Sequence, residues 1–252
     1  MTIKVASARI DERGAIANGK AGDQTGKELM IENGYIWSGG WSVCIRIKDA
    51  AKRKKYIEFI KWAVASKYIG YDQRQRLTLY NAIKKLGYDN YKKLNTYVEC
   101  DCSSLVACGL IVAGFTKINP YDTTSSLEAD IKKKYPNDFR FFNSSYKNGD
   151  HTKIMKWWRN GDILNKAGHH VVTVVSGGRV VTSKSSYYDK YTGKSNKIDE
   201  VFKAIGVPSK YIGSVANRKP IAKANGINDY TGTLVQNLSL ISIAKSGTLK
   251  KV

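Results

Sequence analysis

The stretch ECDCSSLVACGLIVAG, residues 99–114, sets two of the chain's four cysteines directly in front of an apolar run. Asp101 is a residue type favoured at a helix N-cap, and Gly114 suits the position just after a helix end. Between them, apolar residues recur at helical spacing: Leu105, Val106, Leu110 and Ile111. We therefore predict a helix that begins at Cys102, where unpaired backbone N–H groups and the helix dipole favour a thiolate.

A helix N-terminus alone does not supply enough stabilisation to ionise a cysteine near neutral pH. An ordinary thiol has a pKa of about 8.5, and lowering that pKa to about 6 requires roughly 3.4 kcal/mol. The helix dipole contributes typically about 0.3 to 1 kcal/mol and at best about 2. A second positive group is therefore needed, and histidine is the usual one because it also carries the proton.

The chain has three histidines, and two of them, His169 and His170, lie next to each other in GHHVVTVV, residues 168–175. Neighbouring residues on a strand face opposite sides, so only one of the pair can face the cysteine. Val172 and Val174 share a face with His170, and we expect them to seat it on the core side, beside the helix. His169 then faces solvent or the wall of a groove.

Each of these residues also has a simpler interpretation. A small apolar cysteine before a helix is often core filler, and a strand histidine is often structural. We assign Cys44 and Cys108 to packing and Cys100 to a structural role. A metal site formed by Cys100, Cys102 and the histidine pair is disfavoured, because C-x-C is not the usual zinc spacing and adjacent strand histidines diverge. Two cysteines this close in sequence do not bridge easily either.

The order of the predicted elements indicates an α+β fold. A half-buried strand is expected at residues 41–48, helices at 49–67 and 73–85, and the cysteine helix after them. GDIL (161–164) reads as a strand and residues 169–183 as a β-hairpin with its turn at 176–178. We expect one domain over residues 1–221, followed by a linker and short helix at 222–252. That tail is a candidate for a targeting element, for oligomerisation or for simple packing on the core.

The charge of the chain points to a polyanionic partner. Its 252 residues hold 42 Lys and Arg against 21 Asp and Glu, a net charge of +21. Such a charge fits three kinds of partner: nucleic acid, an anionic membrane surface and an acidic polymer of a cell wall. It also fits a protein whose charged surface only keeps it soluble. No zinc-finger, helix-turn-helix or RNP-like signature supports specific nucleic-acid binding. No apolar stretch reaches the length of a membrane span, and the N-terminus lacks an apolar signal core.

Several motifs together resemble a known family. DCSSLV at 101–106 resembles the nucleophile motif of NlpC/P60 and CHAP-type peptidoglycan hydrolases. GDIL followed by HVVTVVSGGRVV at 170–181 resembles their histidine strand, with His170 in the position of the catalytic histidine. AVASKYIGYDQ (63–73) resembles the helix and tyrosine before the nucleophile, and GKAGDQTGKE (19–28) is similar to phage lysins of Gram-positive hosts. The resemblance covers about residues 7 to 185.

The resemblance implies a papain-like α+β core, with the nucleophile helix packed on an antiparallel sheet. It implies cleavage of a peptidoglycan amide by Cys102 as nucleophile and His170 as base, without a metal or other cofactor. The N–H groups of Cys102 and Ser103 would hold the oxyanion and Asp101 would cap the helix. Tyr71 would line the cleft, with Gln24 and Asp72 as weaker candidates. The family's third polar residue corresponds to Thr182, with Ser183 as an alternative.

These expectations combine into one functional hypothesis. The chain is expected to be a phage-lysin type of hydrolase, with an endopeptidase favoured over an N-acetylmuramoyl-L-alanine amidase. Its partners would be Gram-positive peptidoglycan and the anionic polymers attached to it. It would be made in the host cytoplasm and released to the wall by a holin-type route, or carried on the virion. The alternative is a basic protein on an inactive hydrolase fold that binds the wall or nucleic acid.

Overall fold

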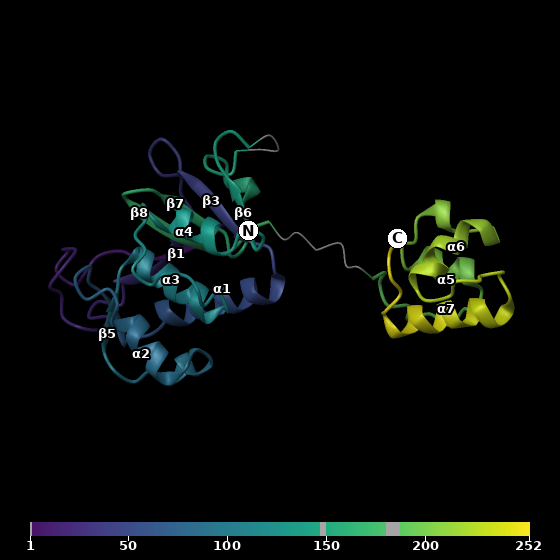
Figure 1. Cartoon of the computed structure of the whole chain (residues 1–252), viewed down its shortest axis with the longest axis horizontal. Coiled ribbons are helices and arrows are strands. Elements are labelled where there is room, and N and C mark those ends of the chain that lie inside the picture. Colours follow the sequence, from purple (N-terminus) through teal and green to yellow (C-terminus); the bar gives the residue numbers. More distant parts are fainter. Residues whose placement is uncertain (1, 147–149, 180–186) are drawn as a thin grey trace. The chain divides into compact units, whose positions relative to one another are not determined.

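The computed structural model describes residues 2–146, 150–179 and 187–252, and it divides the chain into two compact units (Figure 1). The first unit comprises residues 1–180 and the second residues 181–252. The expected boundary after residue 221 is therefore placed too late in the chain. Ile221 and Ala222 are fully buried in the same core as Val201 and Phe202, so the expected boundary would cut through a packed cluster.

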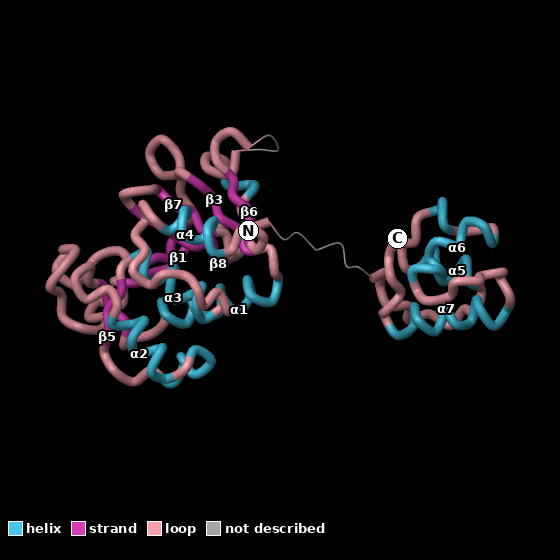
Figure 2. Tube along the Cα trace, in the orientation of Figure 1, coloured by secondary structure: helices cyan, strands magenta, loops and turns pink. Residues whose placement is uncertain are grey.

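A six-stranded antiparallel sheet forms the centre of the first unit, in the order β2-β1-β8-β7-β3-β6. Its strands in chain order are β1 (Lys4–Ala8), β2 (Leu29–Asn33), β3 (Val43–Ile47), β6 (Phe139–Phe142), β7 (Ile163–Lys166) and β8 (His170–Ser176). A separate parallel pair consists of β4 (Ile69–Tyr71) and β5 (Val98–Cys100). Figure 2 shows the strands of the chain gathered in this unit.

Helices α1 (Ala50–Val64) and α3 (Cys102–Val112) pack on one face of this sheet. α2 (Thr78–Leu86) packs on α3 and β5, and α4 (Leu127–Lys134) contributes to the same core. Short 3₁₀ turns lie at Tyr88–Lys93 and Met155–Trp157. α3 packs against α1 and β8, and all of its residues are buried. Gly109 permits this close approach, because a Cβ there would lie 2.9 Å from the Tyr56 ring. The α+β prediction is confirmed, and α3 and β8 lie where the sequence places them.

β3 is buried on both faces, whereas the sequence suggested a half-buried strand. Val43 and Ile45 face the helices, while Cys44 faces a second core on the opposite side of the sheet. Arg46 lies in the same strand and forms a bidentate ion pair with Asp162 of the GDIL motif, with both N–O distances 2.6 Å. Its charge is tolerated inside because the guanidinium and carboxylate satisfy each other.

Several predicted boundaries differ from the observed ones. α1 ends at its C-cap Ala65, two residues before the predicted helix end. α2 begins only at Thr78, because the preceding residues form a turn held by the Asp72 carboxylate. α4 and β6 were not anticipated in the polar region after Gly114. The hairpin partner of β8 is β7, joined to it by a turn at residues 167–169.

The second unit is a small helical domain with its own core. It contains α5 (Ile198–Ala204), a 3₁₀ turn at Ser209–Tyr211, α6 (Val215–Ala224) and α7 (Leu234–Ser246). Arg218 is 8% exposed and ties this unit together through the Asp199 carboxylate (2.8 Å) and the Tyr230 hydroxyl (2.9 Å). Across the described ranges of both units, no helix combines the length and apolar character needed to cross a bilayer.

Candidate active site

Cys102 is the first residue of α3, as the sequence predicts. Asp101 is the N-cap: its carboxylate accepts a hydrogen bond from the Ser104 N–H (2.7 Å), and the Ser104 hydroxyl accepts one from the Asp101 N–H (2.9 Å). This reciprocal capping box fixes the first turn, because it satisfies two donors that lack partners within the helix. Cys102 is 7% exposed, so its thiol is set into the protein at the helix N-terminus.

Strand β8 passes the thiol at Val171. The backbone N–H groups of Val171 and Ser103 both interact with the Cys102 sulfur. The pairing of β1 with β8 extends from Lys4 only to the Ala6–Thr173 pair, so Val171 lies beyond the last β1 partner. The sulfur therefore has one backbone donor from the helix and one from the strand that begins with His170.

The placement of the two histidines corrects one expectation. His170 opens β8 and is half-buried, while His169 is exposed in the preceding turn. Val172 and Val174 belong to the core on the sheet face away from α1 and α3, so they do not seat His170 beside the helix. The strand alternates as expected, but its helix-facing residues are the odd-numbered ones, among them Val171.

The structure brings the strand of His170 to Cys102 without a direct bond between the two side chains. Within the described ranges, no hydrogen bond links the Cys102 sulfur to either imidazole. Val171, whose N–H meets the sulfur, faces the helices, whereas His170 has the parity of Val172 and Val174 on the other face of β8.

Burial has the largest effect on the pKa values of Cys102 and His170. It raises the pKa of the Cys102 thiol to about 12, and the neighbouring Asp101 carboxylate adds to that rise. The N–H groups of Val171 and Ser103 and the Arg76 guanidinium oppose the rise only in part. Burial and the positive charge of Arg9 lower the pKa of His170 to about 4. At neutral pH the resting groups are therefore a neutral thiol and a neutral imidazole, and the predicted resting thiolate is not supported.

Arg76 is part of this site and was missed by sequence reasoning. Its Nε lies 3.0 Å from the Asp101 carboxylate, and its Nη2 donates to the Ser103 hydroxyl (3.0 Å). It thus braces the residues on both sides of Cys102 and supplies a positive charge that lowers the pKa of the thiol. Its position just before α2 gave no signal, because the sequence places it among several other basic residues.

Two tyrosines lie near the thiol. Tyr71, expected from the sequence, ends β4, and its hydroxyl accepts a hydrogen bond from Gln73 Nε2 (3.1 Å). Tyr35, which was not expected, lies in the loop after β2. Burial raises the pKa of each phenol to about 12, and proximity to Cys102 contributes in both cases. Both hydroxyls therefore stay protonated and able to donate a hydrogen bond at neutral pH.

The weaker sequence candidates have other roles. Asp72 is buried and accepts hydrogen bonds from the N–H groups of Asn18 (2.7 Å) and Arg74 (2.6 Å), so it fixes a turn and an N-terminal loop. Gln24 is exposed, and its side chain bonds only within its own loop, to Ala21 and Gly22 carbonyls. Thr182, the candidate third residue, lies outside the described residues, as does its alternative Ser183.

A comparison with family models matches residues 5–181 to the endolysin-like domain (ELLD). The chain belongs to the endolysin-like domain family. Searches among curated proteins and among solved structures found no match to it. Membership indicates a phage-lysin type of function at the cell wall, and the matched range covers Cys102, His170 and all of the six-stranded sheet except Lys4 at the start of β1.

The other cysteines of the endolysin-like domain are unsuited to catalysis. Cys44, Cys100 and Cys108 are free thiols with at most 1% exposure, and burial raises their pKa values well above normal. Cys102 is the most exposed of the four. In the described part of the chain, no three His, Cys, Asp or Glu side chains are grouped so as to hold a metal ion.

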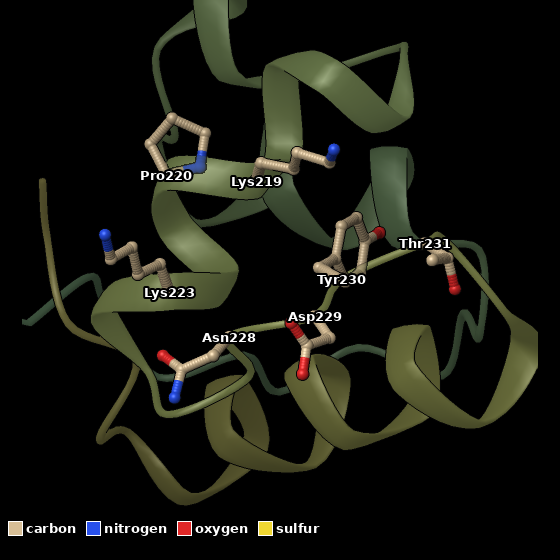
Figure 3. A pocket seen from close by; sticks show the side chains of 7 residues that line it. All are labelled: Lys219, Pro220, Lys223, Asn228, Asp229, Tyr230 and Thr231. Carbon is tan, nitrogen blue, oxygen red and sulfur yellow. The ribbon is translucent and has the colours of Figure 1, made fainter.

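The second unit carries a surface hollow of its own (Figure 3). Lys219 and Lys223 border it from α6, one helical turn apart. Asn228 and Asp229 come from the loop that follows, and the Tyr230 side chain lies beneath it. The hollow is open to solvent, and none of the residues expected for catalysis lines it.

Proposed function

We propose that the endolysin-like domain is a peptidoglycan hydrolase that cleaves an amide bond with Cys102 as nucleophile. The observation that carries this proposal is the position of Cys102 at the N-terminus of α3, directly beside the strand that begins with His170. Membership in a phage-lysin type of family supplies the substrate context. An NlpC/P60- or CHAP-type papain-like core, suggested by the sequence motifs, is part of this proposal.

Because the Cys102 thiol and the His170 imidazole are both neutral at rest, the thiol is activated by proton transfer when substrate binds. His170 takes the proton of Cys102 as the thiolate attacks the carbonyl carbon of the scissile amide. The backbone N–H groups at the helix N-terminus, those of Cys102 and Ser103, stabilise the oxyanion. His170 then gives the proton to the leaving amine, and water hydrolyses the thioester. Arg76 holds Asp101 and Ser103 in place during these steps.

The bond cleaved is proposed to lie in the stem peptide or cross-bridge, which makes the domain an endopeptidase in preference to an amidase. Either reaction uses the same nucleophile, base and oxyanion donors. The domain would reach its substrate after release from the host cytoplasm, by a holin-type route or on the virion. Thr182 is still proposed as the residue that orients the imidazole of His170.

The positive charge would concentrate the protein on an anionic wall. The second unit holds twelve Lys and Arg residues and four acidic ones. The lysine pair at the hollow of Figure 3 offers a site for phosphate or carboxylate groups of wall polymers. We propose wall attachment as the role of this unit, in place of the shorter tail expected from the sequence.

Release of dye from labelled Gram-positive walls tests the nucleophile. We expect Cys102→Ala to abolish release and Cys100→Ala, a matched control two residues away, to retain most of it. A folded Cys102→Ala variant that releases dye at the wild-type rate would refute the assignment. If no version releases dye but all bind walls, the domain is a binding protein on an inactive hydrolase fold.

A further inference from the structure

The imidazole of His170 lacks a hydrogen-bonded orienting partner in the described ranges, but it has an aromatic one. The ring centroid of Trp37 lies 6.0 Å from that of His170 and 5.9 Å from that of His169. Both separations fall in the range of tilted aromatic pairs, which add stabilisation beyond simple burial. Trp37 therefore contacts both histidines at the start of β8.

The loop that carries Trp37 is fastened to the same hairpin. The Lys166 ammonium donates to the Gly40 carbonyl (3.0 Å), and the Ala167 N–H donates to the Ser42 hydroxyl (3.1 Å). Both bonds join the segment between β2 and β3 to the turn that precedes His170. The position of Trp37 is thus set relative to the imidazole from two sides.

The Trp41 ring packs against the Trp37 ring. It is 3% exposed, its ring centroid lies 5.8 Å from that of Trp37, and its Nε1 donates to the Tyr35 carbonyl (3.3 Å). This stack excludes water from one side of the imidazole. The charged group acting on His170 is Arg9, which is paired with Glu32 (2.8 Å); Cys102, Tyr35 and His169 are the other titratable groups at this end of the sheet.

We propose that Trp37 is a positioning residue, which holds the His170 imidazole in the orientation that lets it accept the Cys102 proton. The effect of Trp37 on catalysis rests on the proposed function, whereas the packing of Trp37 on His170 does not depend on that function. Trp37 would take over part of the role that a polar third residue has in the resembled hydrolases.

Histidine NMR tests the packing directly, because the chain has only three histidines. In wild type, we expect the imidazole of His170 to titrate near pH 4. Trp37→Ala should move that titration toward the ordinary value of 6.5, since the ring becomes solvated. Trp37→Phe should keep most of the lowered value. Trp157→Ala is the matched control, because Trp157 stacks on His151 and leaves His170 alone.

Wall digestion by the same variants tests the catalytic consequence. Trp37→Ala should lower kcat about 10- to 100-fold with little change in KM, the scale expected for a displaced catalytic group. Its acid limb should move to higher pH, and Trp37→Phe should recover most of the rate. An unchanged His170 titration in folded Trp37→Ala overturns the proposal, as does a shifted titration with an unaltered kcat. If wild type digests no wall, the proposed function fails, and Trp37 as a positioning residue fails with it, while the titration separately reports the packing.

Discussion

Glu99→Gln should make the protein more stable in alkaline solution, because Glu99 is a buried acid that pairs with no cation in the part of the chain that the structure describes. It is 2% exposed on β5, next to Cys100. Its Oε1 accepts a hydrogen bond from the Gly22 N–H (2.8 Å), while its Oε2 has no hydrogen-bond partner among the described residues. Glu28, 1% exposed, lies close by: a Cβ on Gly70 would lie 2.8 Å from Oε2 of both carboxylates. Two ionised carboxylates in so small a space would repel each other.

Burial first, and Glu28 after it, raise the pKa of Glu99 to about 8, against 4.5 for an ordinary glutamate. A pKa that is higher in the folded state stabilises the fold at low pH, and this contribution is lost as pH rises from 4.5 to 8. The slope is at most about 1.4 kcal/mol per pH unit, which gives no more than about 5 kcal/mol over the window. Glutamine carries no charge at any pH and can still accept from Gly22.

Urea unfolding at half-unit steps from pH 5 to pH 9 measures this difference. We expect the wild-type free energy of unfolding to fall relative to that of Glu99→Gln by several kcal/mol between pH 5 and pH 8. Glu58→Gln serves as control, since Glu58 is exposed on α1 and should give a curve parallel to wild type. Parallel curves for wild type and Glu99→Gln would refute the reasoning, because they would mean that Glu99 ionises alike in both states.

Three further predictions follow from the site and the fold. Iodoacetamide should modify Cys102 slowly at pH 7 and about tenfold faster per pH unit up to pH 10, because the Cys102 pKa of about 12 leaves thiolate scarce. Peptide mapping by mass spectrometry measures the rate, and a rate constant that stays constant above pH 6 would indicate an ionised resting thiol. Asp162→Ala should cost about 3 to 5 kcal/mol of unfolding free energy, since it leaves Arg46 buried and unpaired; a loss below 1 kcal/mol in urea titrations would contradict this. Wall lysis should weaken as salt rises past physiological strength, where the Debye length is about 8 Å; lysis unchanged in 0.5 M salt would remove the role proposed for the charge.

The sequence predicts the local features of the site well. The N-cap at Asp101, the helix start at Cys102 and the strand at His170 are all decided by residues within a few positions of one another. Cap preference and hydrophobic period are local properties, so they are visible in one sequence. The α+β class follows from the order of these elements.

The features that the sequence could not reveal depend on distant segments. Trp37 reaches His170 from a loop more than a hundred residues earlier, and Arg76 reaches Asp101 from the segment before α2. Helical position favours a thiolate at Cys102, but burial by the surrounding fold raises its pKa instead. The sheet face of His170 was misjudged because both faces of β8 are apolar. The domain boundary was misplaced because the core of the second unit begins well before residue 221.

Mass spectrometry of the soluble products from purified Gram-positive peptidoglycan tests the central claim most directly. Wild type and Cys102→Ser would digest the same walls in parallel. The account predicts defined fragments from wild type alone, each with one new amino terminus and one new carboxyl terminus from a single kind of stem-peptide or cross-bridge amide bond. Identical fragments from Cys102→Ser, or no fragments from wild type on any wall type tried, would contradict it.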